Sequence, residues 1–312
     1  MADENWERTM IERLATEGVL EQQRARRWGI FFKLLGFGCV FLVLFLVFAS
    51  IGASDRGCQD KCTALVELRG ELDSDSRASA ENVIAGLQAA FKEKGTQGVI
   101  LKVDSPGGSP VQAGAINDEI RRLRAKYPDT PIYAVVEEIC ASGAYYVAVA
   151  TDKIFVDKAS LVGSIGVIMD GFGFVGIMDK LGVERRALTA GENKDFLDQF
   201  APVVPKQKEY AQQMLDEIHL QFITAVKQGR GARLKETPEM FSGLVWSGQR
   251  SIELGLTDAL GTVNSVARDV IKAEDVVDFT QQETLADRVA RKFGASMGST
   301  LASSIGKSMH LR

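Results

Sequence analysis

Histidine is almost absent from this chain of 312 residues, which contains only His219 and His310. His219 lies in a run with helical spacing, where we expect an ordinary, partly buried histidine, and His310 lies next to the end of the chain. Two histidines so placed give poor support for a Ser-His-Asp arrangement, in which histidine is the base. They also bring too few ligands for a typical metal site. The sequence therefore predicts no metal.

Cysteine is scarce as well, with four residues. Cys39 falls in a long apolar stretch and Cys140 beside a serine, so the four do not form a metal-binding set. Cys58 and Cys62, in a C-x3-C spacing, could pair in an oxidising compartment. The spacing alone leaves open whether they do.

Neither sign of charge dominates, because 37 basic and 41 acidic residues give a formal net charge of -4. This balance gives no reason to expect nucleic acid as a partner. Charge is missing altogether from residues 34–53, a stretch long enough to cross the hydrocarbon core of a membrane. A secretory signal has a shorter apolar region of about 7–15 residues. We therefore expect an uncleaved anchor, although the small residues at 49–53 leave late cleavage open.

The flanks of this stretch predict its orientation. Basic residues crowd the N-terminal side (Arg24, Arg26, Arg27 and Lys33), whereas the charges that follow it roughly balance. The positive-inside rule then predicts a cytoplasmic segment 1–29, an anchor 30–53, a body 54–280 outside the cytoplasm and a C-terminal tail 281–312. In a Gram-negative cell the body would be periplasmic. Residues 6–14 have helical spacing and are expected to lie on the membrane face.

Hydrophobic periodicity in the body predicts alternating strands and helices. Strands are expected at 63–69, 98–103, 132–136, 153–156, 165–169 and 183–188. Helices are expected at 77–94, 111–127, from 142 onward, at 174–181, 205–228, up to 254, and at 263–272. Such alternation indicates right-handed βαβ units, and so an α/β fold with a parallel sheet covered by helices.

A serine stands at one predicted junction of strand and helix, in Cys140-Ala-Ser-Gly-Ala-Tyr-Tyr-Val-Ala148. At such a junction the hydroxyl of Ser142 is exposed and backbone N–H groups point outward. That geometry suits a nucleophile whose acyl intermediate needs an oxyanion site. The alternative is that Ser142 only caps the helix.

Two further motifs supply partners for such a serine. In Gly191-Glu-Asn-Lys-Asp195, Lys194 follows a predicted strand and could act as a base, although most lysines are solvated surface groups and the acidic neighbours oppose deprotonation. In the run D-S-P-G-G-S at 104–109, Gly107 and Gly108 could leave backbone N–H groups open to a carbonyl oxygen. A plain tight turn is the alternative.

Five motifs taken in order resemble signal peptide peptidase A, a family of membrane peptidases with a Ser/Lys dyad. They are D-S-P-G-G-S, A-S-G-A-Y-Y-V-A, V-G-S-I-G-V, G-E-N-K-D and V-W-S-G-Q-R-S-I-E-L-G-L-T-D-A-L-G, and the resemblance covers residues 64–270. It implies a crotonase-like fold, related to that of the caseinolytic protease subunit. One departure is Ala144, which stands where a second glycine is common.

The resemblance also implies roles for individual residues. Ser142 matches the nucleophile, Lys194 the general base, and Ser164 a hydroxyl that holds the lysine amine. The oxyanion and substrate-binding region is matched by Gly107, Gly108 and Gly143. The expected activity is endopeptidase cleavage of released signal peptides and other peptides at the membrane, without a cofactor. The expected assembly is a membrane-tethered homo-oligomer whose neighbouring subunits share active sites.

Two other functions remain open from the sequence. A crotonase-like acyl-CoA enzyme would use the same glycine-rich turn, but the predicted location outside the cytoplasm argues against it. A catalytically silent membrane scaffold would have no need for Ser142, Lys194 and Ser164 together.

Overall fold

The computed structural model describes residues 10, 23–24, 26–45, 57–58 and 60–281. Within the N-terminal part, Arg26–Phe45 is one helix, long and apolar enough to cross a membrane by length and composition, and its side chains are exposed. The predicted anchor at 30–53 is described only as far as residue 45. The predicted helix at 6–14 and the tail from 282 onward also lie outside the described residues, except for Met10. The domain boundaries stay a prediction.

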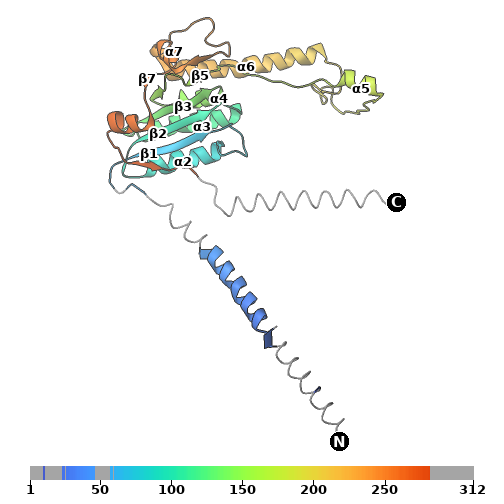
Figure 1. Ribbon diagram of the computed structural model, residues 1–312. Coiled ribbons are helices and arrows are strands. Elements are labelled where there is room, and N and C mark those ends of the chain that lie inside the picture. Colours follow the sequence, from blue (N-terminus) through green and yellow to red (C-terminus); the bar gives the residue numbers. More distant parts are fainter. Residues whose placement is uncertain (1–9, 11–22, 25, 46–56, 59, 282–312) are drawn as a thin grey trace. The chain divides into compact units, whose positions relative to one another are not determined.

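A second compact unit, Gly57–Gln282, holds all the other described elements (Figure 1). Its strands are β1 (Cys62–Arg69), β2 (Thr96–Ser105), β3 (Ile132–Ala141), β4 (Lys153–Val156), β5 (Leu161–Gly163), β6 (Val245–Ser247), β7 (Ala259–Leu260) and β8 (Val276–Asp278). Its helices are α2 (Ala80–Lys92), α3 (Pro110–Lys126), α4 (Gly143–Ala148), α5 (Val175–Leu181), α6 (Pro205–Arg230), α7 (Gly248–Glu253) and α8 (Val263–Ser265), with η1 (Gly231–Arg233) and the π-helical η2 (Val266–Ile271).

The strands form one sheet in the order β6-β5-β3-β2-β1-β8, with β4 pairing β3 and β7. All pairings between these strands are parallel except that of β5 with β6. Helices α2, α3 and α4 cover one face, where the larger core includes Leu87, Ile116 and Tyr145. On the other face Val266 of η2 packs with Ile100 in a smaller core. The predicted α/β fold with a parallel sheet is confirmed.

Capping residues begin the helices where the sequence places them. The Ser79 side chain accepts a hydrogen bond from the Asn82 amide at the start of α2, and Ser109 does the same for Gln112 ahead of Pro110 in α3. Both helices bury their apolar stripe on the sheet, so their packing as well as their caps fixes their bounds.

Strand β3 changes its partner partway along. Its first half pairs with β4 through residues 133–135, and its last residues, 139–141, pair with β5. Between them the register to β2 shifts, since Val103 faces Val136 but Ser105 faces Cys140. The extra residues of β3 form a bulge, which bends the strand. This bend sets the end of β3 beside the end of β5.

Two of the predicted strands are absent. Residues 165–169 and 183–188 have no strand structure, and Ile168 and Leu188 are among the most exposed apolar side chains of the described chain. Residues 167–169 and the whole of 183–188 belong to a projection that we call the arm, residues 167–204, whereas Ile165 is buried in the larger core. Apolar β-branched residues favour a strand only where another strand pairs with them, and within the arm the described residues offer none.

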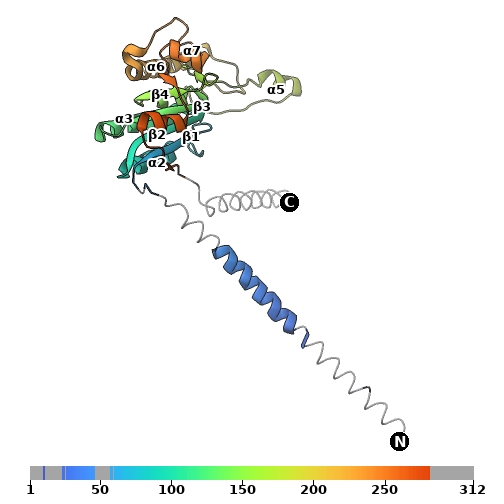
Figure 2. The same cartoon turned by 60° about the vertical axis from the view of Figure 1, so that its left-hand side comes forward.

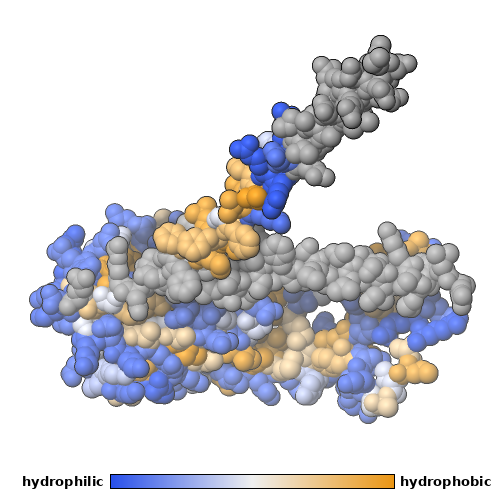
Figure 3. Space-filling model, turned by 90° about the horizontal axis from the view of Figure 1, so that it is seen from below, coloured by the Kyte–Doolittle hydropathy of each residue, from blue (hydrophilic) through white to orange (hydrophobic). Residues whose placement is uncertain are grey.

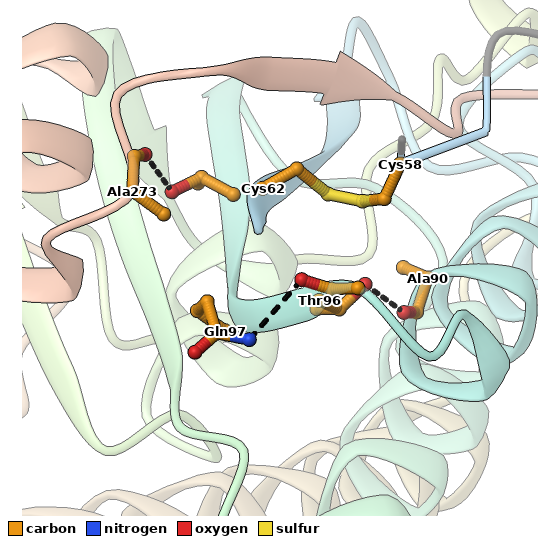
Figure 4. The surroundings of a disulfide bond; sticks show 8 residues. Cys58, Cys62, Ala90, Thr96, Gln97 and Ala273 are labelled. Atoms are coloured by element: carbon orange, nitrogen blue, oxygen red, sulfur yellow. Dashed lines mark hydrogen bonds between the residues drawn. A yellow bond between two sulfur atoms is a disulfide. The ribbon is translucent and has the colours of Figure 1, made fainter. Parts of the chain in front are cut away.

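A disulfide joins Cys58 to Cys62, which settles the pairing that the spacing left open (Figure 4). The Cys62 amide donates to the Gly95 carbonyl at 3.0 Å, so the bridge lies against the turn between α2 and β2. A Cβ atom on Gly95 would clash with Cys58 Cβ, so only glycine fits in this turn. The segment that precedes β1 is thus attached to the turn between α2 and β2.

Candidate active site

Ser142 lies between the end of β3 and the start of α4. Its backbone has φ 52° and ψ -125°, a conformation that costs energy for any residue other than glycine. The Ser142 amide donates to the Gly163 carbonyl at 2.8 Å, which helps to hold this conformation. The side chain makes no capping hydrogen bond with α4. The interpretation of Ser142 as a mere helix cap is therefore wrong.

The turn containing Gly107 and Gly108 lies directly against this serine. Gly107 has φ +101°, and a Cβ atom there would stand 2.7 Å from the Gly143 nitrogen and 2.8 Å from Ser142 Cβ. The Ser105 hydroxyl accepts a hydrogen bond from the Gly107 amide at 3.2 Å, which stabilises the turn. Glycine is required here both by its dihedral angle and by the lack of space. The supporting role of Ser105 was not predicted from the motifs.

Two backbone amides meet between this turn and α4. Leu72 pairs with the turn by donating to the Gly107 carbonyl and accepting from the Ser109 amide, a pattern that leaves the Gly108 amide outside the pairing. The Gly143 amide belongs to the first turn of α4 and has no partner within that helix. A Cβ atom on Gly143 would be 3.5 Å from the Gly108 nitrogen. The two amides therefore lie close together beside Ser142, the arrangement expected of an oxyanion site.

Ser164 follows β5, the strand that pairs with the end of β3. It too has a positive φ, of 52°, and its amide donates to the Leu244 carbonyl at 2.7 Å. Ala141 and Gly163 face each other in the pairing, so Ser142 and Ser164 leave adjacent strand ends. The structure thus brings together five of the predicted residues: Ser142, Ser164, Gly107, Gly108 and Gly143.

Lys194 is not part of this group within the chain. It is exposed, and its amide donates to the Gly191 carbonyl at 3.1 Å in a turn of the arm. The ring of Phe196, two residues further on, contacts Tyr210 near the start of α6, at 5.9 Å between centroids. The turn that carries Lys194 is therefore attached to the N-terminal part of α6.

The length of α6 separates that turn from Ser142. The Phe222 ring contacts Tyr146 of α4 at 5.2 Å, so the second half of α6 lies on α4. Tyr210 precedes Phe222 by twelve residues, which corresponds to about 18 Å along a helix. Figure 1 shows α5 and the N-terminal end of α6 projecting away from α4, and Figure 2 shows α5 standing out from the sheet. Lys194 is thus held far from the serine of its own chain.

A cavity of about 710 Å³ opens on the arm beside the Lys194 turn. Asp195, Leu197 and Asp198 of that turn line it, together with apolar residues of the arm and of α6 that include Val204 and Leu215. Asp198 also forms an ion pair with Arg185. The cavity belongs to the arm and not to the surroundings of Ser142.

Cys140, two residues before Ser142, is a core side chain. It is fully buried in the larger core, and burial raises the pKa of its thiol. A thiol that keeps its proton is a poor nucleophile, so Cys140 does not compete with Ser142. In the part of the chain that the structure describes, no three His, Cys, Asp or Glu side chains gather in a way that could hold a metal.

Comparison with known proteins identifies the family of this chain. The model of peptidase family S49 matches residues 124–277, a range that contains Ser142, Ser164 and Lys194. A protein of Synechocystis sp., provisionally named a protease, is 30% identical over 202 residues, which cover 65% of this chain and 70% of that one. The chain therefore belongs to peptidase family S49, a class of serine peptidases. The membership and the serine-peptidase class predicted from the motifs are confirmed.

Two other similarities concern parts of larger or more distant proteins. The Na(+)/H(+) antiporter NhaA of Brucella melitensis biotype 1 is 43% identical over 182 residues, or 58% of this chain and only 25% of the antiporter. The chain thus matches a quarter of that relative's length. A solved mutant of the 1510-N membrane-bound stomatin-specific protease, in complex with a substrate peptide, has a TM-score of 0.45 and 14% identity, covering 75% of this chain and 98% of that one.

Proposed function

We propose that this protein is a membrane-anchored serine endopeptidase that cleaves released signal peptides and other peptides with a Ser142–Lys194 dyad. The observation that carries the proposal is the strained Ser142, packed against the Gly107–Gly108 turn, in a chain of family S49. Strain of this kind is kept where the surrounding structure enforces it, and it concentrates at active sites.

The geometry supports an acyl-enzyme mechanism. Ser142 Oγ attacks the carbonyl carbon of the scissile peptide bond while the neutral amine of Lys194 takes the hydroxyl proton. The amides of Gly108 and Gly143 stabilise the negative oxygen that develops. The amine then passes the proton to the leaving nitrogen, the peptide bond breaks, and an ester remains on Ser142. Water, activated by the same amine, hydrolyses this ester and restores both groups. Ser164, at the neighbouring strand end, orients the amine.

Lys194 reaches the site from a neighbouring subunit. The separation of Lys194 from Ser142 along α6 supports this, because one chain does not bring them together. The arm also exposes large apolar side chains, with Ile168, Phe172 and Leu188 at 83%, 78% and 101% of full exposure. Hydrophobic residues are visible at the end of the molecule where Figure 1 shows α5 (Figure 3). Apolar surface of this extent is typical of an interface, and head-to-tail contacts between copies close into a ring.

The helix Arg26–Phe45 would serve as the anchor, in contact with membrane lipid. Arg24, Arg26, Arg27 and Lys33 lie at its N-terminal end, which the positive-inside rule places in the cytoplasm. The unit that carries Ser142 then lies on the far side of the bacterial inner membrane, in the periplasm. Peptides released after signal cleavage are produced at that membrane, and this location brings the site to them.

Labelling with a fluorophosphonate probe tests the proposal. The full-length protein should become covalently labelled and hydrolyse a peptide that contains small apolar residues. Ser142→Ala should lose both, by many powers of ten for hydrolysis, since the nucleophile itself is removed. Thermal unfolding should stay close to that of the wild type, because Ser142 makes no side-chain cap. Labelling that persists in the folded variant would reject Ser142, and a wild type that is never labelled would favour a silent scaffold.

A further inference from the structure

A buried polar network lies behind helix α4, in the segment 245–261 that the mechanism above does not use. The Tyr145 hydroxyl donates to the Leu256 carbonyl at 2.7 Å, and the Tyr145 side chain is fully buried. Burial raises the pKa of this hydroxyl, which therefore keeps its proton and remains a donor. Because Tyr145 is three residues from Ser142, this bond joins the helix of the nucleophile to a turn more than a hundred residues away.

The turn that accepts this bond is itself rigidly held. Arg230 donates through Nε to the Gly255 carbonyl at 2.8 Å and through its two Nη atoms to both carboxylate oxygens of Asp258, at 2.8 and 3.0 Å. Asp258 also accepts from the Ile154 amide at 2.7 Å. Burial raises the pKa of the Asp258 carboxyl, but the hydrogen bond and charge of Arg230 more than offset this and lower it. The pair is therefore ionised at neutral pH and fixes residues 255–258.

Helix α4 depends on an attachment to the rigid turn at residues 255–258. It has six residues, too few to be stable by its own hydrogen bonds. Its first residue follows the strained Ser142, whose backbone would relax if α4 were free to shift. A phenylalanine would bury the same apolar area as Tyr145. The hydroxyl therefore contributes its directional hydrogen bond to Leu256 and no additional apolar burial. A buried ion pair likewise contributes little net stability compared with apolar residues.

We propose that Tyr145 is a positioning residue for Ser142, which it holds by tying α4 to the turn that the Arg230–Asp258 pair fixes. The inference rests on the proposed function, since it concerns the nucleophile of that reaction. Its consequence is a loss of reactivity at Ser142 without a loss of peptide binding when the tie is removed.

Tyr145→Phe tests this in the full-length protein, with Tyr146→Phe as the matched control. Tyr146 is the next residue of the same helix; its ring is only partly buried, and within the described residues its hydroxyl makes no hydrogen bond. The measurements are the rate constant for fluorophosphonate labelling, kcat and KM for a peptide, and the thermal unfolding midpoint. All rates are measured at a temperature well below the lowest thermal unfolding midpoint of the variants.

Tyr145→Phe should lower both the labelling rate and kcat about tenfold or more, with KM changed less than about twofold. Tyr146→Phe should match the wild type in all three. Asp258→Asn should reproduce the loss, and the double variant with Tyr145→Phe should lose less than the product of the two effects, because both act through one network.

Three results would overturn the positioning role. In the first, Tyr145→Phe unfolds at a lower temperature but keeps the wild-type kcat. The Tyr145–Leu256 hydrogen bond would then stabilise the fold without affecting Ser142. In the second, KM rises while kcat does not change. In the third, the double variant loses the full product of the two single-variant effects on kcat. Tyr145 would then act independently of the Arg230–Asp258 pair. A wild-type protein that is not labelled at all would instead reject the proposed function, and the inference with it. That outcome is distinguishable from the three above, in which the wild type is active.

Discussion

Individual residues of this protein carry backbone strain where the proposed chemistry takes place. Among the described residues other than glycine, four have a positive φ: Ser142, Ser164, Leu197 and Lys272. Ser142 and Ser164 occupy adjacent strand ends, and Leu197 follows Lys194 by three residues. Each such conformation costs on the order of 1–3 kcal/mol and persists only where neighbouring contacts enforce it. Two of these four residues, Ser142 and Ser164, are therefore ones that the motifs also indicated.

Replacing Lys194 by arginine should abolish hydrolysis while keeping the positive charge. A guanidinium remains protonated at all accessible pH values and cannot act as a base. Wild-type hydrolysis should increase with rising pH, because a general base acts only in its unprotonated form. Initial rates between pH 5 and pH 10 test both statements, with Ser164→Ala as a variant that should weaken activity and not remove it. Wild-type activity that stays level down to pH 5, or an active Lys194→Arg, would point to another base.

At the scale of secondary-structure elements, the site depends on two irregular features and not on the regular ones. The bulge in β3 moves its last residues from β4 to β5, and so puts Ser142 next to Ser164. The turn at 107–108 then places its amides against the start of α4. Both features are local departures from the strand and helix repeats, and together they place Ser142 beside Ser164 and beside the 107–108 turn.

Gly107→Ala and Gly114→Ala should have opposite effects on stability. At Gly107 the new methyl group would collide with the Gly143 nitrogen at a φ of +101°, so we expect a loss of about 2 kcal/mol or more together with loss of hydrolysis. Gly114 lies inside α3 with open space around it, and alanine there should stabilise the protein by up to about 1 kcal/mol with activity unchanged. Denaturant unfolding and peptide hydrolysis measure both. A harmless Gly107→Ala would contradict the close approach of turn and helix.

For the molecule as a whole, the arm is the decisive feature. It carries Lys194 and a wide apolar surface away from α4, while the sheet and its two cores hold Ser142 in place. Under the proposed shared dyad, Ser142 and Lys194 of one chain would each meet a different neighbouring subunit. Assembly is thus part of the proposed catalytic mechanism.

Mixed assemblies of Ser142→Ala and Lys194→Ala subunits should regain activity. In equal, random mixtures, an intact serine meets an intact lysine in about one-half times one-half, or roughly a quarter, of the sites. A dyad formed within one chain would recover none. The measurement is peptide hydrolysis after co-expression, with each variant alone as the control. Continued inactivity despite verified co-assembly would reject the shared site and leave the dyad itself untouched.

The orientation in the membrane gives a separate prediction. Alkaline phosphatase fused after residue 60 should be active, because this reporter needs the oxidising conditions outside the cytoplasm for its disulfides. The same location suits the Cys58–Cys62 bridge. An inactive fusion, paired with an active cytoplasmic reporter at the same position, would reverse the topology.

The sequence by itself determined the elements whose repeat is long and regular. The strand at 153–156 matches β4, and the predicted helices at 111–127 and 205–228 differ from α3 and α6 by no more than two residues at either end. It failed for 165–169 and 183–188, and it missed the short strands β5, β6, β7 and β8. Whether a short segment is a strand depends on having a partner, which a local pattern does not contain.

For the site, the order of the motifs indicated Ser142, Lys194, Ser164 and the glycines, since each motif is a local run of residues. Which of them meet was decided by tertiary structure alone. The bulge in β3 brings Ser142 to Ser164, and the length of α6 keeps Lys194 away. The link from Tyr145 to Leu256 spans more than a hundred residues and has no signature in either motif. Distances of this kind follow from how packed elements sit on one another, and not from the spacing of residues along the chain.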